Sequence, residues 1–483
     1  MASIVLLTVF LLAMVCIGIW GMRRTKTLGD FFLGGRTVGP WFSAFAYGTT
    51  YFSAVVFIGF GGKIGWGFGL NGLWIAVGNA LVGSLLAWLV LGARTRRMSQ
   101  NLDVMTMPEF LHERYAGKFI KMITAIIIFV FLLPYSASVF KGLGYLFEAT
   151  FNMPFDTALL IMIGITGIYL ILGGYWAVTL TDFVQGFIML VGSVALVWVL
   201  VGKAGGAHDL IPQIIAKHAE HVPAAPNYWL LASLVFMTSF GTWGMPQMVQ
   251  KFYAIKNEKV IVRAAIATFL FACVITFAAY FTGALTHLFY NAPVMVNGNP
   301  AFDRIIPKLL IENLPGPLMA VILLLVLSAS MSTLASLVLV SASAIAVDLY
   351  KGHIDPKITK ENSLIMMRFL SGVFIAISYF IARYDFAFIV TLMSLSWGAI
   401  AGAFMAPFIY GLYWKRATLL GVKAGMLTGL VLSIVLYFKL GQQLSPVAAS
   451  IAMIVPFFVV PLVSVFTRPP DKKLIEKAFG GIK

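Results

Sequence analysis

The chain of 483 residues is strongly apolar, since 60% of its residues are hydrophobic, only 11% are charged and its mean hydropathy is +0.94. Soluble domains average about 25% charged residues, so this composition excludes a soluble protein and indicates a polytopic membrane protein. The formal net charge of +16 does not indicate a nucleic-acid partner, because the basic residues are scattered over short loops and form no patch.

About thirteen apolar stretches are long enough to cross a lipid bilayer as helices. They are 2–22, 40–62, 66–93, 120–150, 155–176, 178–202, 227–250, 260–290, 315–348, 363–383, 386–414, 417–438 and 445–467. The first lacks an obvious cleavage site and reads as a retained helix, not a signal peptide. The sequence therefore predicts an all-α membrane protein with a single membrane domain over residues 1–483.

The distribution of basic residues predicts the orientation of the chain. Most of the 34 Lys and Arg residues lie on the side that carries the loops after the first, third, seventh, ninth and eleventh spans and the tail 468–483. Representative clusters are Arg23, Arg24, Lys26 and Arg36; Arg94, Arg96 and Arg97; Lys251, Lys256 and Lys259; Lys415 and Arg416; and Lys472, Lys473 and Lys477. Because basic loops stay inside, we expect a cell-membrane protein with its N-terminus outside and a short cytoplasmic tail.

Two spans contain residues that interrupt helices. The second span carries Gly48 beside hydroxyl-bearing residues, and the seventh carries Gly241, Gly244 and Pro246. The interrupted spans are five helices apart, which predicts two inverted five-helix halves, helices 2–6 (about 40–202) and helices 7–11 (about 227–414), with extra helices at both ends. Transporters built in this way bind substrate where the helices break. Two independent kinks are the alternative.

The ninth span carries a stripe of small and hydroxyl-bearing residues from Ser328 to Ser336. A helix places Ala329, Ser332, Thr333 and Ser336 on one face. Such a stripe serves either close helix packing or a cation site, because small residues let helices approach and a hard cation needs oxygen ligands that lipid does not supply.

Two charges stand out within the apolar spans. Asp182 opens the sixth span, where it is either a carboxylate favoured by the helix dipole or a cavity-facing group that holds a cation. Lys141 lies in the outer half of the fourth span, where it either extends to the membrane interface or pairs with an anionic substrate group. His218 and His221, in a polar loop, are expected to be surface residues.

An ordered set of motifs resembles the sodium:solute symporter family. They are Phe31–Arg36, Met107–Phe110 with Arg114 and Tyr115, Gly173–Gln185, Ala329–Thr333 and Asp348–Lys351. The resemblance spans the first nine helices and implies a LeuT-like inverted five-helix repeat. It also implies a sodium-coupled symporter and no enzyme activity, in keeping with the lack of paired catalytic carboxylates or histidines in the spans.

The resemblance also implies sodium ligands. The shared family site would use the backbone carbonyls of Thr49, Phe52 and Ala329 with the hydroxyls of Ser332 and Thr333. A second site found in some members would use three side chains here, those of Asp182, Ser332 and Ser336. Ala335 stands where such members carry a serine, and a methyl group cannot coordinate sodium, which puts the second site and the stoichiometry in question.

For the substrate, the resemblance points to the space between the broken helices and the fourth span. The residues there are Ser53, Tyr135, Thr238, Thr242 and Trp243, with Lys141 as a further candidate. The aromatic pair of proline symporters is replaced by Thr238 and Thr242. We therefore expect import of a carboxylate-bearing organic acid or amino acid with sodium, by a chain for which a monomer suffices. A sodium-coupled sugar transporter is the alternative, and a transporter-like channel or sensor is less expected, since no signalling domain follows Thr467.

Overall fold

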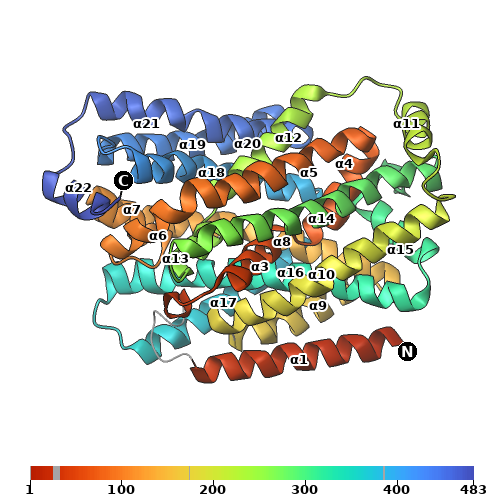
Figure 1. The fold of residues 1–483 in the computed structure, drawn as a ribbon, viewed down its shortest axis with the longest axis horizontal. Coiled ribbons are helices and arrows are strands. Elements are labelled where there is room, and N and C mark those ends of the chain that lie inside the picture. Colours follow the sequence, from red (N-terminus) through yellow and green to blue (C-terminus); the bar gives the residue numbers. More distant parts are fainter. Residues whose placement is uncertain (1, 25–32, 173–174, 385–386, 483) are drawn as a thin grey trace.

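The computed structural model describes residues 2–24, 33–172, 175–384 and 387–482. Long helices run side by side along one direction and form a bundle (Figure 1). Within the described ranges, nine helices are long and apolar enough to cross a membrane, and shorter apolar stretches lie at Val5–Trp20 and Phe155–Gly164. The predicted helical membrane protein is confirmed, whereas the number thirteen stays a prediction.

The elements follow one another with short connections. The first part of the chain forms α1 (Ala2–Arg24), η1 (Gly34–Arg36), α3 (Pro40–Tyr51), η2 (Val55–Phe60), α4 (Gly61–Phe68), η3 (Gly69–Gly72), α5 (Leu73–Gly78), η4 (Asn79–Leu91), α6 (Gly92–Asn101), α7 (Met107–Tyr115), α8 (Lys118–Phe151), α9 (Phe155–Leu172) and α10 (Tyr175–Lys203). The middle forms α11 (Leu210–His221), α12 (Tyr228–Phe240), η5 (Gly241–Trp243), α13 (Pro246–Ala254), α14 (Lys259–Phe289), β1 (Met295–Val296), β2 (Asn299–Pro300), η6 (Phe302–Arg304) and α15 (Ile305–Asn313). The last part forms α16 (Gly316–Ser343), η7 (Ala344–Ile354), α17 (Lys360–Arg383), α18 (Ile389–Tyr413), α19 (Leu419–Leu440), η8 (Gln442–Leu444), α20 (Ser445–Ile454), α21 (Pro456–Val465) and α22 (Lys472–Phe479).

One predicted boundary is wrong. The third span was expected to begin near residue 66, but α4 continues to Phe68 and α5 begins only at Leu73. Gly69 ends α4 with φ 53°, a left-handed conformation that glycine adopts without a steric penalty. The chain reverses there, so the apolar stretch after residue 66 belongs partly to the preceding helix.

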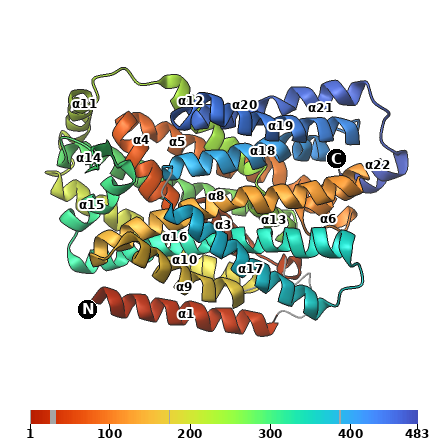
Figure 2. The same ribbon diagram turned by 180° about the vertical axis from the view of Figure 1, so that it is seen from behind.

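Helices α16 and α18 form the centre of the bundle, where both views place α3 close to α16 (Figures 1 and 2). The most apolar parts of α16 and α18 are 89% and 94% buried, compared with 28% for α17. Helix α3 packs against α10, α14 and α16. The hydroxyl stripe of α16 therefore faces protein and not lipid.

The two chain ends lie at opposite ends of the bundle (Figure 1). The C-terminus lies beside α7 and α22, and the N-terminus lies at the end that carries α11 and α15; we name these the α22 end and the α11 end. Helix α22 belongs to the predicted tail 468–483 and is docked, because the Asn101 amide donates to the carbonyls of Ala478 and Gly480 at 3.1 and 2.8 Å.

Candidate functional site

Helix α3 breaks in the middle of the bundle, as its sequence predicts. Phe52 ends the helix with extended backbone angles, and the π-helical segment η2 continues after it. The backbone N–H groups freed by the break find hydroxyl acceptors: that of Val55 donates to Ser53 Oγ, and that of Ala54 donates to Ser330 Oγ, both at 3.2 Å. Buried backbone polar groups need such partners, so α16 stabilises the break.

The carbonyls at the end of α3 meet the hydroxyl stripe of α16. Ser332 Oγ donates to the carbonyl of Thr49 at 2.8 Å, and Thr333 Oγ1 lies 3.2 Å from the same oxygen and 3.1 Å from that of Thr50. Both hydroxyls also lie 3.0 Å from the carbonyl of Ala329. Four of the five predicted ligands of the shared site thus come together, with Phe52 at the break beside them. These neutral, hard oxygens are the kind of ligand that fits sodium.

The proposed residues of the second sodium site are arranged differently. Asp182 and Ser336 both contact the buried ammonium of Lys251, whose Nζ lies 3.6 Å from Asp182 Oδ2 and donates to Ser336 Oγ at 3.1 Å. Ser332 contacts the end of α3 instead. Asp182 is also not at a helix start, because α10 begins at Tyr175, about two turns earlier.

The burial of Lys251 was missed from the sequence. It was placed among the basic loop residues just after a span predicted to end at residue 250, but α13 continues to Ala254, and Lys251 is 2% exposed. A lysine at the predicted edge of a span is ordinarily assigned to the interface, so only the partners across the bundle reveal its position.

The second break lies between α12 and α13. A 3₁₀ turn covers Gly241–Trp243, and Met245 is extended before Pro246 begins α13. A Cβ atom on Gly241 would lie 2.6 Å from the ring of Trp397, and one on Gly244 would lie 2.8 Å from Met405. These glycines are needed because the break packs directly against α18.

The polar candidates at this break hydrogen-bond nearby backbone. Thr238 donates to the carbonyl of Leu234 at 2.8 Å, and Thr242 lies 3.0 and 3.3 Å from the carbonyls of Ser239 and Gly83. Trp243 Nε1 donates to the carbonyl of Val82 at 3.1 Å. The break is linked to α3 because the hydroxyl of Tyr51 donates to the carbonyl of Thr238 at 2.6 Å.

An aromatic cluster joins the two breaks to α8 and α18. The ring of Trp397 lies 6.3 Å from that of Tyr51 and 5.9 Å from that of Tyr135, and the Tyr135 side chain interacts with Ser53. Trp397 Nε1 is buried and has no hydrogen-bond partner within the described parts of the chain. Trp397 was not predicted as a site residue; its signal is a tryptophan between Ser396 and Gly398 within an apolar span.

Lys141 does not extend to the membrane interface, so that interpretation is wrong. It is 2% exposed, lies 3.9 Å from Asp303 Oδ2 and donates to the carbonyl of Ala387. Asp303 in turn accepts the backbone N–H of Ile389 at 3.0 Å, at the start of α18. Lys141 therefore holds α8 against η6 and α18, while lining a cavity of about 360 Å³ with Tyr145.

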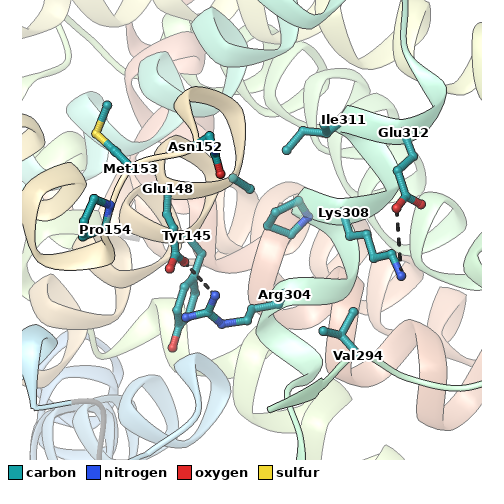
Figure 3. Close-up of a pocket in the computed structure, with 12 residues that line it drawn as sticks. Tyr145, Glu148, Asn152, Met153, Pro154, Val294, Arg304, Lys308, Ile311 and Glu312 are labelled. Atoms are coloured by element: carbon teal, nitrogen blue, oxygen red, sulfur yellow. Dashed lines mark ion pairs between the residues drawn. The ribbon is translucent and has the colours of Figure 1, made fainter.

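A second cavity of about 580 Å³ lies beside the first towards α15 (Figure 3). Arg304 and Tyr145 line both cavities. Arg304 pairs with Glu148 at 2.9 Å, and its guanidinium lies 4.8 Å from the ring centre of Tyr145. Figure 3 shows Arg304 pointing towards Glu148 and Tyr145, with Lys308 and Glu312 on the opposite wall. The cavity beside Lys141 thus adjoins a second cavity lined by the charged residues Glu148, Arg304, Lys308 and Glu312.

Two of the sequence motifs meet at the α22 end. Thr106, next to the Met107–Phe110 motif, donates to Asp348 Oδ1 at 2.9 Å. Lys121 lies 3.4 Å from Asp348 and 3.6 Å from Glu109. These contacts of Glu109 and Asp348 hold α7, α8 and η7 together. Phe31, Phe32, Lys26, Gly173 and Gly174 lie outside the described residues.

Comparison with known proteins places this arrangement among transporters. The profile of the sodium:solute symporter family matches residues 31–429. The osmoregulated proline transporter OpuE of Bacillus subtilis is 28% identical, with 97% of this chain and 96% of that protein covered. The sodium/proline symporter of Salmonella typhimurium is 30% identical over 88% of this chain and 86% of the relative.

Solved structures show the same fold at low sequence identity. A substrate-bound, outward-open sodium-coupled sialic acid symporter has a TM-score of 0.80 at 17% identity and covers 98% of both chains. The closed form of the nucleobase-cation symporter Mhp1 has a TM-score of 0.58 at 14% identity, covering 93% of this chain and 97% of that one. Both neighbours are LeuT-fold transporters.

Proposed function

Because this chain belongs to the sodium:solute symporter family and is thereby sodium-coupled, we propose that it imports a small carboxylate-bearing solute, foremost an amino acid, by alternating access. The observation that carries the proposal is the convergence of the Ser332 and Thr333 hydroxyls on the carbonyl of Thr49 at the helix break. Relatives named as proline transporters support an amino acid over a sugar.

In the proposed mechanism, sodium binds among Thr49, Phe52, Ala329, Ser332 and Thr333. All these ligands are neutral oxygens, so sodium binding there requires no proton release. Inward movement of one positive charge gains about 2.3 kcal/mol per 100 mV of membrane potential. Coupling requires that sodium favour the outward-open state, because a ligand with equal affinity for both states shifts neither.

The proposed topology follows the sequence predictions. Thirteen helices cross the cell membrane, helices 2–6 and 7–11 form inverted repeats, and the α22 end faces the cytoplasm. The observed breaks in the second and seventh predicted spans support the repeat. The basic residues near α6, α13 and α22 support the orientation. One chain contains both breaks, so a monomer suffices for transport.

The proposed substrate site lies between the two breaks and α8. Ser53, Tyr135 and Trp397 form its wall beside the sodium site, and Thr238, Thr242 and Trp243 form the wall at the second break. Lys141 and Asp303 lie nearer the α11 end, where we infer that they close the external side and that Lys141 attracts the substrate carboxylate. The ion pair with Asp303 would separate when this side opens.

A thermal-shift screen of purified protein tests the substrate class. L-Proline, other amino acids, monocarboxylates and sugars are each added with sodium or with potassium, because a ligand of the folded state raises the melting temperature. We expect stabilisation by an amino acid only in sodium. Stabilisation by sugars alone would favour the sugar-transporter alternative.

Uptake into proteoliposomes then separates symport from a channel. The solute identified by the screen should accumulate above its external concentration when an inward sodium gradient is imposed, and it should only equilibrate without that gradient. Sodium flux without solute accumulation would contradict symport and favour a transporter-like channel.

A further inference from the structure

A fixed positive charge lies next to the proposed sodium site. Lys251 from α13 is 2% exposed and Asp182 from α10 is fully buried, with their charged atoms 3.6 Å apart. Asp182 has no hydrogen-bond partner for either carboxylate oxygen among the described residues. A buried carboxylate is strongly unfavourable without a nearby cation, so the Lys251 ammonium is the group that stabilises it.

The ammonium also contacts one of the hydroxyl groups that a cation at this place would use. It donates to Ser336 Oγ at 3.1 Å, and Ser336 Oγ lies 3.0 Å from Thr50 Oγ1. The ring of Tyr175 lies 5.3 Å from Lys251 Nζ. A carboxylate, the Ser336 hydroxyl and an aromatic ring thus surround a single positive charge that is part of the chain itself, and the Thr50 hydroxyl lies one hydrogen bond further away.

This cluster and the proposed sodium site are built from successive positions of the same helices. Ser336 follows Ser332 by one turn of α16, about 5.4 Å along the axis, and Thr50 follows Thr49 in α3. A sodium ion at the first site would therefore lie roughly one helical turn from the residues that contact the ammonium. The Asp182 carboxylate offsets the repulsion that this proximity would cause.

We propose that Lys251 takes the place of a second sodium ion, so that the carrier binds one sodium ion per transport cycle, with Lys251 as the permanent counter-ion of Asp182. This inference rests on the proposed sodium-coupled function and names the stoichiometry of its ion site. It also explains why a methyl group is tolerated at Ala335: with the lysine ammonium in place of a second sodium ion, no further oxygen ligand is needed there.

Equilibrium binding of radioactive sodium to the purified full-length chain tests the inference without knowledge of the substrate. The wild type is expected to bind one sodium ion. In Lys251→Met, Asp182, Ser336 and Thr50 are released to hold an ion, and the number of bound sodium ions should rise to two. Lys256→Met, which removes an exposed lysine just after α13, is the matched control and should keep one sodium ion.

The charge balance is tested separately with Asp182→Asn. The ammonium is then no longer offset, so the number of sites should stay at one while sodium affinity falls by about tenfold. Adding Lys251→Met to Asp182→Asn removes the repulsion and should restore the affinity with one site. This recovery would show that the Lys251 ammonium acts on the bound sodium ion, and it can be measured even when Lys251→Met alone does not fold.

The role of Lys251 and the proposed sodium site can fail separately. Two sodium ions bound to the wild type, or unchanged affinity in Asp182→Asn, would overturn the role of Lys251 and leave the proposed symport intact. No saturable sodium binding to the wild type would overturn the proposed sodium site and this inference together.

Discussion

The two helix breaks differ in how their freed backbone is bonded, although at the second break the carbonyl of Thr238 also accepts a hydrogen bond from a hydroxyl of α3, that of Tyr51. At the end of α3, the carbonyls of Thr49 and Thr50 accept bonds from the hydroxyls of a different helix, α16. Between α12 and α13, the 3₁₀ turn bonds within its own segment, and Gly241 and Gly244 let it pack against α18. The first break thus presents oxygen atoms that an ion can take over, whereas the second presents a tightly packed surface. Similar glycine-containing interruptions in the sequence therefore carry different chemistry.

The largest effect is expected from removing both hydroxyls at the first break. Ser332→Ala with Thr333→Val leaves the helix intact but deletes two of the five proposed ligands. The sodium concentration for half-maximal uptake should rise more than about tenfold, since neutral hydrogen-bonding groups contribute roughly 1 kcal/mol each. Ser328→Ala, one turn away on α16, is the control. Unchanged sodium dependence in the double variant would remove the ion site from the first break.

At the second break the expected effect is on stability. Gly241→Ala forces a methyl group against Trp397 and should lower the free energy of unfolding by about 1–3 kcal/mol, with sodium affinity little changed. Gly372→Ala in α17 meets no atom within 4 Å and serves as the control. Thermal unfolding measures the first effect and sodium binding the second. A loss of sodium affinity in Gly241→Ala would mean that the breaks are not functionally separate.

A smaller effect is expected on substrate affinity. Tyr135→Phe removes a hydroxyl that interacts with Ser53 and should raise KM several-fold, because both side chains belong to the proposed substrate wall near the first break. Thr242→Val should have less effect, since its hydroxyl already lies 3.0 Å from the carbonyl of Ser239. The two variants are compared by initial rates of uptake. A greater effect for Thr242→Val would show that the second break also recognises substrate through polar groups.

The smallest effect is expected from pH, outside both breaks. His218 of α11, half-buried and expected from the sequence to be a surface residue, packs 4.8 Å from the ring of His287. Burial lowers the pKa of His218, partly offset by a bond to the backbone of Gly67, and neighbouring His221 lowers it further. A lowered folded-state pKa means that α11 is held most firmly above pH about 6.5 and loosens as the pH falls.

Hydrogen exchange of the α11 amides measures this loosening. Protection should fall by about threefold between pH 8 and pH 5.5 in the wild type and by less in His218→Gln. Sodium affinity should stay level over the same range, because the ligands proposed at the first break do not titrate. A parallel fall of sodium affinity would connect the ion site to a titrating group and contradict the prediction that pH acts on α11 but not on the first break.

The sequence predicted most of what depends on local chemistry. The polar residues around Gly48 predicted the first break, although Gly48 itself lies inside α3 and the helix ends only at Phe52. Gly241, Gly244 and Pro246 predicted the second break, because Gly and Pro interrupt helices. The spacing of Ser332 and Thr333 placed both hydroxyls on one face of α16. These predictions needed only the helical period and backbone geometry.

The charged residues were predicted less well. Lys141 was given membrane-interface and substrate roles, and its partner Asp303 comes from η6, far along the chain. Lys251 was assigned to a loop. A charged residue within an apolar span requires a partner of opposite charge, but the neighbouring sequence does not indicate which helix provides that partner.

By itself, the sequence determined that this is a helical membrane protein with two interrupted helices and a hydroxyl stripe, because composition, periodicity and helix-breaking residues act locally. Only the tertiary structure decided which oxygen atoms meet at the first break and which cation pairs with Asp182. Those pairings depend on how separate helices pack. Because burying an uncompensated charge is costly, the buried Asp182 carboxylate requires a cation beside it, and the packing of α13 against the bundle provides Lys251.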